Sequence, residues 1–291
     1  MRKPASLTLG RRTFGPDELV VMAIVNRTPD SFFDQGAFTE DAAALAAVDR
    51  AVDEGAQIVD LGGVKAGPGP AVDAQEEIRR TAGVVAAARA RHGDLVISVD
   101  TWRAEVARAV CDAGADLIND AWGGPDPDLP AVATSFGAGL VCSHAGGLPP
   151  RTDPHRVAYD DVVADVVATV TTLADRAVAA GVRPDSILVD AAHDFGKNTY
   201  HSLEVTRRLD ELVATGWPVL VAVSNKKFLG EVLDADKDNR LEATLAVTAW
   251  CAQQGGRVFR AHQVAATRRV LDTVGAIRGT AAPAVSRRAL A

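Results

Sequence analysis

The sequence predicts an α/β protein that folds as a single (β/α)8 TIM barrel. Three observations lead to this prediction. Short apolar runs rich in Val, Ile and Leu recur along the chain, and Ala-rich segments with helical spacing separate most of them. No G-x-G-x-x-G follows the first run, as a dinucleotide-binding doubly wound sheet would require. Eight repeated strand–helix units therefore favour a closed barrel over an open sheet.

Each apolar run is typical of a strand that is buried on both faces of a parallel sheet. The runs are at 20–25, 57–61, 95–99, 116–118, 139–142, 186–189, 218–223 and 257–261. Helices are expected at 40–54, 74–91, 103–113, 157–180, 201–214, 240–254 and 264–278, with one more near Leu129–Phe136 in a shorter link. Glycines such as Gly55, Gly114 and Gly181 fall between a helical pattern and the next strand, where a helix C-cap is expected.

The predicted domain spans residues 1–278. Residues 1–19 form an N-terminal extension with a possible hairpin over Leu7–Phe14 that turns at Gly10. The stretch 279–291 is small, basic and without pattern, and is expected to be a disordered tail. Although 291 residues would allow two domains, barrels of about 250 residues are single domains.

Composition narrows the classes of partner. A net charge of −7 argues against a general nucleic-acid or membrane surface, so an anionic small molecule would need a local basic pocket. The three cysteines, Cys111, Cys142 and Cys251, are far apart and show no zinc-type spacing, which indicates reduced core thiols. The N-terminal residues contain no apolar leader segment, and no run is long enough to cross a membrane. We expect a cytoplasmic protein.

Polar residues follow every predicted strand. In barrel enzymes the chemistry gathers at the carboxyl ends of the strands, so these side chains are expected to converge. In chain order they are Asn26, Asp60, Asp100, Asn119, Ser143 with His144, Asp190, Ser224 with Lys226, and Arg260 with His262. This set predicts an active site.

The residue types also suggest a ligand. Asp100, Asn119 and Asp190 offer acceptors and an amide donor that suit the amino-amidine edge of a heterocycle, which a carboxylate binds in a bidentate way. Lys226 can donate to a ring oxygen or nitrogen. Arg260, His262 and Asn26 suit a phosphate group, or a Mg²⁺ ion that bridges one.

Seven segments in order resemble dihydropteroate synthases over residues 20–265. They are N-R-T-P-D-S-F (26–32), D-L-G-G (60–63), S-V-D-T (98–101), I-N-D (118–120), D-F-G-K (194–197), S-N-K-K-F-L-G (224–230) and R-A-H (260–262). The resemblance implies a barrel that usually forms a homodimer, here through a surface that includes Leu241, Leu245, Val247 and Trp250. It implies a reaction of folate synthesis that joins p-aminobenzoate to a dihydropterin and releases pyrophosphate.

The same resemblance implies roles for individual residues. Asp100, Asn119, Asp190 and Lys226 match the pterin contacts of the family. Asn26, Arg260 and His262 match its pyrophosphate contacts, with Asn26 also beside Mg²⁺, and Ser224 matches a residue near the aminobenzoate, so that sulfonamide-type mimics are possible ligands. Lys226, Arg260 and His262 are the expected catalytic residues. Catalysis in this family is mainly positioning of the substrates and stabilisation of the leaving pyrophosphate.

The sequence departs from the family at its loops. Where the family reads D-x-G-G-E-S-T-R-P-G, the chain has Lys65, Ala66 and Gly67 in place of the Ser, Thr and Arg. Further differences are Arg27 in the first loop, Asp194 in a glycine position of the sixth, and Asn225 in place of an arginine in the seventh. Each lost donor aimed at developing charge typically lowers the rate by about 10²–10³.

We therefore expect a pterin-binding barrel whose synthase activity is lost or very weak. Two alternatives remain open. One is an active dihydropteroate synthase in which Lys65 and the altered loops supply the missing contacts differently. The other is a methyl-pterin-dependent methyltransferase, although such proteins do not usually keep N-x-T-P-D-S-F and R-x-H, both of which are present here.

Overall fold

The predicted barrel is confirmed by the structure, a computed structural model that describes residues 6–26, 37–152 and 156–288. Eight parallel strands close in the order β10-β3-β4-β5-β6-β7-β8-β9. They are β3 (Val20–Asn26), β4 (Ile58–Gly62), β5 (Val96–Asp100), β6 (Leu117–Asp120), β7 (Gly139–Ser143), β8 (Ile187–Asp190), β9 (Val219–Val221) and β10 (Val258–Ala261).

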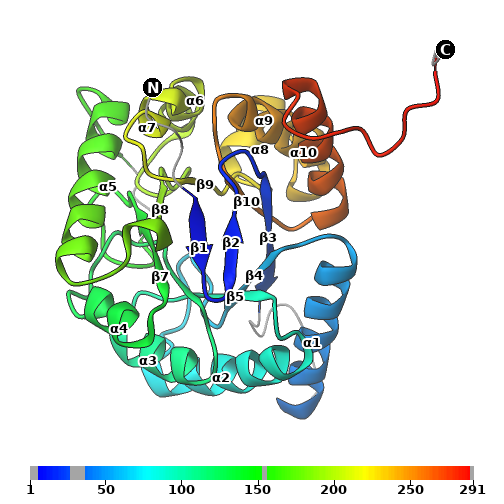
Figure 1. Cartoon of the computed structure of the whole chain (residues 1–291). Helices are drawn as coiled ribbons and strands as arrows, with labels where there is room; N and C mark the ends of the chain where they lie inside the picture. The colour runs from blue at the N-terminus through cyan, green and yellow to red at the C-terminus, as the bar shows by residue number, and fades with distance from the viewer. Residues whose placement is uncertain (1–5, 27–36, 153–155, 289–291) are drawn as a thin grey trace.

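Helices surround the strands on the outside of the barrel (Figure 1). They are α1 (Ala37–Asp53), α2 (Ala74–Arg91), α3 (Ala104–Asp112), α4 (Leu129–Phe136), α5 (Val162–Ala179), α6 (Thr199–Arg207), α7 (Leu209–Val213), α8 (Lys227–Leu233), α9 (Leu241–Gln253) and α10 (Val264–Arg278). Two short 3-10 turns, η2 (Pro184–Ser186) and η3 (Lys237–Asn239), precede β8 and α9. The strand and helix assignments follow the sequence pattern closely.

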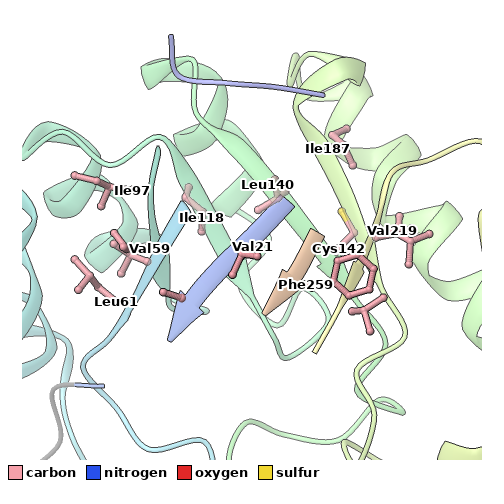
Figure 2. Close-up of a cluster of buried hydrophobic side chains, with 14 of the residues drawn as sticks. Val21, Val59, Leu61, Ile97, Ile118, Leu140, Cys142, Ile187, Val219 and Phe259 are labelled. Carbon is pink, nitrogen blue, oxygen red and sulfur yellow. The ribbon is translucent and has the colours of Figure 1, made fainter. Parts of the chain in front are cut away.

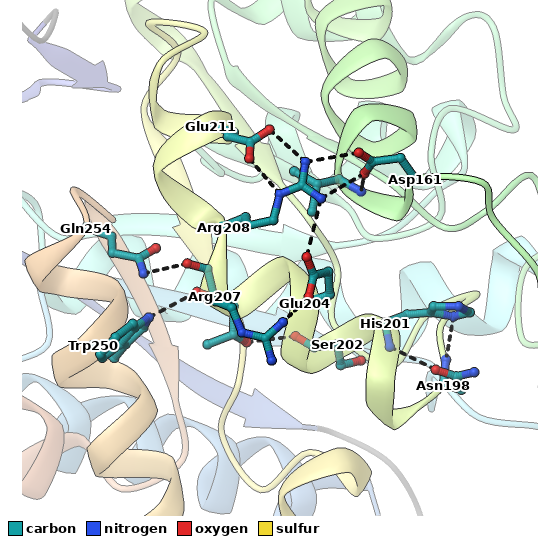
Figure 3. A network of polar contacts seen from close by, with 12 residues as sticks. Asp161, Asn198, His201, Ser202, Glu204, Arg207, Arg208, Glu211, Trp250 and Gln254 are labelled. Atoms are coloured by element: carbon teal, nitrogen blue, oxygen red, sulfur yellow. Dashed lines mark hydrogen bonds and ion pairs between the residues drawn. The ribbon is translucent and has the colours of Figure 1, made fainter.

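Two helical features differ from the prediction. The helix expected over 201–214 is divided into α6 and α7 at Arg208, whose backbone leaves the helical region. The Arg208 guanidinium there binds Asp161, Glu204 and Glu211 (Figure 3). In addition, the segment 227–233 forms the helix α8, which the sequence did not predict. The helix is too short to show an amphipathic pattern.

An antiparallel hairpin of β1 (Leu7–Leu9) and β2 (Arg12–Phe14) covers one end of the barrel (Figure 1). Gly10 sits in its turn with φ of 55°. The side chains of Leu7, Leu9 and Phe14 are fully buried. They share one cluster with the first inward-facing residues of the strands, which are Val20, Met22, Ile58, Val96, Leu117, Val141, Leu188, Leu220 and Val258. The hairpin therefore closes the amino-terminal end of the barrel with apolar side chains.

Strand residues alternate between two cores, as the period of two in a strand requires. Along β3, Val20 and Met22 belong to the inner cluster, whereas Val21 and Ala23 pack outward against helices. Figure 2 shows part of the outer core, including Val21, Val59 and Ile97. Further along β3, Ile24 and Asn26 line a cavity at the open end. The alternation thus decides which polar residues face the barrel axis.

Residues 279–288 follow α10 as an exposed segment without helix or strand (Figure 1). Residues 289–291 and Met1–Ala5 lie outside the described part of the chain, as does the segment 27–36, which contains Arg27 and most of the N-R-T-P-D-S-F motif. The expected disorder of the tail stays a prediction. Within the described ranges, no helix is both long and apolar enough to cross a membrane.

We predict that Leu9→Ala lowers the free energy of unfolding by about 3 kcal/mol, because it opens a void at the closed end of the barrel. Denaturant unfolding measures the loss. Thr13→Ala in the same hairpin is the control, because Thr13 is exposed and should change the stability by less than about 0.5 kcal/mol. Similar losses in both variants would contradict the role given to the hairpin core.

Candidate active site

A cavity of about 490 Å³ opens at the carboxyl ends of the strands. Eight of the predicted site residues line it, namely Asn26, Asp100, Asn119, Asp190, Ser224, Lys226, Arg260 and His262. The other strand-end residues that the sequence predicts, Asp60, Ser143 and His144, are buried and do not line it. The eight lining residues come from β3, β5, β6, β8 and β10 and from the loops after β9 and β10. Their convergence is a finding of the structure, whereas their roles toward a ligand stay predictions.

The cavity floor is held by the carboxylate of Asp60, which is fully buried inside the barrel. Asp60 accepts hydrogen bonds from Ser98 Oγ at 2.5 Å, from Asn119 Nδ2 at 3.0 Å and from Arg260 Nε at 2.6 Å. A buried charge is tolerated when it is paired and hydrogen-bonded in this way. Asp60 therefore fixes the orientation of two of the predicted site residues.

Arg260 is shared between two carboxylates. Its Nη2 donates to Asp100 Oδ2 at 3.0 Å while its Nε holds Asp60. A guanidinium fork held at both sides has a fixed plane, which a lysine could not reproduce. Part of the donor capacity predicted for a phosphate is thus already used within the floor, and Arg260 contributes fixed positive charge at this end of the cavity.

The floor carboxylates and the lysine have shifted proton affinities. Burial raises the pKa of Asp100 to about 7, with Arg260 opposing the shift and Asp60 adding to it. Burial also raises the pKa of Asp190, whose Oδ1 accepts a hydrogen bond from Ala192 N at 2.8 Å. Burial lowers the pKa of Lys226, with Asp194 and Asp190 opposing. Groups with such shifts are concentrated at functional sites.

Ser224 and His262 form a pair across the ends of β9 and β10. Ser224 Oγ lies 2.9 Å from His262 Nδ1, and His262 N donates to Ser224 Oγ at 3.1 Å. Burial lowers the pKa of His262 to about 4, and the positive charges of Arg260, Lys237 and Lys226 act in the same direction. The imidazole is therefore neutral at physiological pH.

Two aromatic rings form one wall of the cavity. Trp122 lies edge-on to Phe195, with 4.8 Å between the ring centroids. Lys226 Nζ lies 4.2 Å from the centroid of the Phe195 ring, within the range of a cation–π contact. Trp122 lies three positions after Asn119 and lines the cavity. A flat heterocycle has an apolar face available here.

Lys197, in the D-F-G-K motif, supports this wall from behind. Its buried Nζ lies 2.7 Å from His144 Nδ1 and donates to the carbonyl oxygens of His144 at 2.9 Å and Phe195 at 3.0 Å. His144 Nε2 in turn lies 2.7 Å from Asp165 Oδ1. Gly196 must lack a side chain, because a Cβ there would lie 2.6 Å from Ala145 O. The loops after β7 and β8 are thus packed as one unit.

The loop after β4 carries the main departure from the family pattern and lies along the cavity. Lys65, Ala66, Gly67 and Pro68 line it. Arg80 Nη1 donates to Gly63 O at 2.9 Å, and Arg151 donates to Gly67 O at 3.2 Å and to Pro70 O at 2.7 Å. The altered loop is therefore tied in place by arginines from two other parts of the barrel.

Ser98, Lys197 and Arg151 are the supporting residues to which sequence reasoning assigned no role, whereas Asp60 was expected in the site and instead supports it from inside the barrel. Ser98 carried a usable signal, because it is a polar residue inside an apolar strand and lies two positions before Asp100. Arg151 gave no such signal, since its partners are backbone carbonyls more than eighty positions away. Within the described residues, no three or more His, Cys, Asp or Glu side chains are placed to hold a metal ion.

A profile of the family described as "Pterin binding enzyme" matches residues 22–262. The chain is 58% identical over 284 residues to a Mycobacterium leprae protein named "Inactive dihydropteroate synthase 2", covering 96% of this chain and 98% of that protein. The dihydropteroate synthase of Xanthomonas albilineans, solved with 4-aminobenzoic acid, is 34% identical with a TM-score of 0.86, covering 97% of this chain and 100% of the other. The Yersinia pestis enzyme, solved with a sulfonamide drug complex, is 32% identical with a TM-score of 0.86, covering 95% and 100%.

These matches extend over nearly the whole chain and coincide with the barrel and cavity described above. The protein belongs to the pterin-binding enzyme family, and its barrel is of the dihydropteroate synthase type.

Proposed function

We propose that the protein binds a pterin on the cavity floor and has little or no dihydropteroate synthase turnover. The observation that carries this proposal is a contrast within one cavity. Asp100, Asn119, Asp190 and Lys226 are assembled around a supporting network, whereas the adjoining loop offers Ala66 and Gly67 where the family pattern has a threonine and an arginine. The name of the M. leprae relative agrees with this proposal.

The chemistry of the floor suits an amino-amidine edge. The Asp100 carboxyl group, whose pKa burial raises, offers oxygen acceptors to N–H donors, and Asn119 lies beside it on the neighbouring strand. Asp190 and Lys226 also line the cavity, and Lys226 can donate to a ring oxygen. Trp122 and Phe195, whose rings meet edge to face, give the heterocycle an apolar aromatic wall.

The charge of the cavity lining suits an anion. The lining contains five basic residues, Lys65, Lys226, Lys227, Lys237 and Arg260, against the three acidic residues Asp100, Asp190 and Asp194. This local excess of positive charge occurs in a chain whose net charge is −7. A pyrophosphate group on a pterin would therefore be attracted to the side of Arg260 and His262.

Mg²⁺ fits this end only together with such a substrate. Mg²⁺ prefers six oxygen ligands and often takes several from phosphates and water. Asn26 can supply one amide oxygen, and the absent side chain of Gly62 leaves room beside it, because a Cβ at that position would lie 3.3 Å from Asn26 Oδ1. When bound, the ion would neutralise charge on the pyrophosphate.

We further propose a cytoplasmic homodimer. The three cysteines are buried free thiols, as a reducing compartment favours. Leu241, Leu245 and Val247 on α9 are partly buried, whereas 53% of Trp250 is exposed even though its indole nitrogen donates to Thr206 O at 3.2 Å (Figure 3). A large ring that is fixed in place and half exposed suits an interface between two copies.

Asp190→Asn is expected to weaken pterin binding by at least about 100-fold, because an amide cannot accept two N–H donors with a full charge. Calorimetry with 6-hydroxymethylpterin measures the affinity. Asp94→Asn is the control, since Asp94 is exposed in the turn before β5 at the opposite end of the barrel. Unchanged affinity in Asp190→Asn would refute the placement of the ring on the floor.

Restoring the loop should raise the turnover. Ala66→Thr with Gly67→Arg is expected to increase pyrophosphate release from dihydropterin pyrophosphate, p-aminobenzoate and Mg²⁺ by about 100-fold. The arginine can be accommodated, because a Cβ at Gly67 meets no atom within 4 Å. Ala66→Thr with Gly67→Gln adds similar bulk without the cation and should not reproduce the gain. Release by the unaltered protein near about 1 s⁻¹, an ordinary enzymatic rate, would instead establish an active synthase.

His262 is expected to report the arrival of an anion. In the free protein its pKa is about 4, and a bound pyrophosphate should raise that value because nearby negative charge favours the imidazolium form. NMR titration of labelled histidines, with and without inorganic pyrophosphate and Mg²⁺, measures the change. His193 is the internal control, since burial lowers its pKa to about 3 and it does not line the cavity. An unshifted His262 at saturating pyrophosphate would place the anion elsewhere.

A further inference from the structure

Asp194 is a carboxylate in a position that favours glycine. Its φ is 69°, in the left-handed region that side chains rarely adopt, and the family pattern has glycine here. Its backbone N donates to Ser202 Oγ at 3.2 Å, which fixes the loop between β8 and α6. A strained aspartate that lines a cavity indicates that its side chain has a use.

The carboxylate reaches across the cavity rim to the first turn of α8. Oδ2 accepts a hydrogen bond from Lys227 N at 2.5 Å, and Oδ1 accepts one from Phe228 N at 3.2 Å. Asp194 also lies close enough to Lys226 to be the largest electrostatic influence that favours the charged form of that ammonium. The main-chain donors and part of the lysine charge at this rim are therefore already matched by an internal anion.

We propose that Asp194 determines ligand specificity by excluding a carboxylate from this rim. The proposal rests on the proposed pterin function, and it concerns the second ligand that would lie beside the pterin. That ligand would be an aromatic amine whose far end is neutral or cationic. A p-aminobenzoate whose carboxylate reached the Asn225–Phe228 segment would meet a like charge where the Asp194 side chain now binds.

The other charged groups at the rim do not remove this effect. Lys227 and Lys237 also line the cavity and attract anions in general. Both lysines are exposed, so solvent and salt screen their charges, whereas the Asp194 carboxylate is fixed at the main-chain donors by two hydrogen bonds. A fixed charge acts most strongly on a ligand group that approaches the same donors.

The test compares three ligands that differ at one end: p-aminobenzoate, the neutral p-aminobenzamide and the cationic 4-aminobenzylamine. Their affinities are measured by calorimetry for the unaltered protein, Asp194→Asn and Asp194→Gly, each with and without saturating 6-hydroxymethylpterin. The unaltered protein should bind the amide about tenfold more tightly than the acid. Asp194→Asn and Asp194→Gly should each raise the affinity for the acid about tenfold and change that for the amide by less than about twofold.

Asp234→Asn is the matched control, because Asp234 also has a positive φ, of 50°, and lies at the other end of the same helix α8 without lining the cavity. It should leave the acid-to-amide ratio unchanged. A thermal melt of each variant shows that it is folded.

Equal changes for the acid and the amide would overturn the proposal, since they would show that Asp194 only shapes the loop. Binding of none of the three ligands by any folded variant would overturn it as well. Pterin binding is measured separately by titration with 6-hydroxymethylpterin alone. A failure of pterin binding is therefore distinguished from a failure to bind the three aromatic amines.

Discussion

The buried Asp60 carboxylate is the constraint on which the site depends. It stands inside the barrel, on β4, and binds side chains from β5, β6 and β10. Because an unpaired charge at this depth would cost several kcal/mol, its partners are held tightly in place. Asn119 and Arg260 therefore reach the cavity with fixed orientations. Arg260 in turn orients Asp100 by donating a hydrogen bond to its carboxylate.

The floor and the rim of the cavity are built on different principles. The floor is made of strand residues whose direction is set by the pleat, so it changes little while the barrel is intact. The rim is made of loops, where insertions and substitutions are tolerated. Lys65, Ala66, Gly67 and Asp194 all lie on the rim. The chain can thus keep a pterin-shaped floor while its capacity for transfer chemistry changes.

The altered rim is nevertheless ordered. Arg80 and Arg151 bind main-chain oxygens of the loop after β4, and Lys197 binds those of the loops after β7 and β8. These anchors bind main-chain carbonyls, so they hold the loop against the cavity whatever its side chains are. A loop that is held in place but has Ala66 and Gly67 where the family pattern has a threonine and an arginine is consistent with binding that is separated from catalysis.

The sequence by itself determined the barrel, its strands and eight of the cavity residues. Continuous apolar runs that alternate with helical segments indicated a parallel sheet, and the carboxyl ends of its strands meet at one rim. The order of the motifs also led to the family. Local pattern did not reveal α8, which is too short for an amphipathic signal, or the division of the predicted helix at Arg208.

Only the tertiary structure decided how the polar groups pair. The contacts of Asp60 with Arg260 and of Arg151 with the loop after β4 join residues 200 and more than 80 positions apart, and no periodicity predicts them. The same holds for Asp194, whose acidic side chain was evident in the sequence but whose hydrogen bonds to α8 arise from the meeting of two loops. The residue types determine which donors and acceptors the chain has. Closure of the barrel determines which of them pair with one another and which face the cavity.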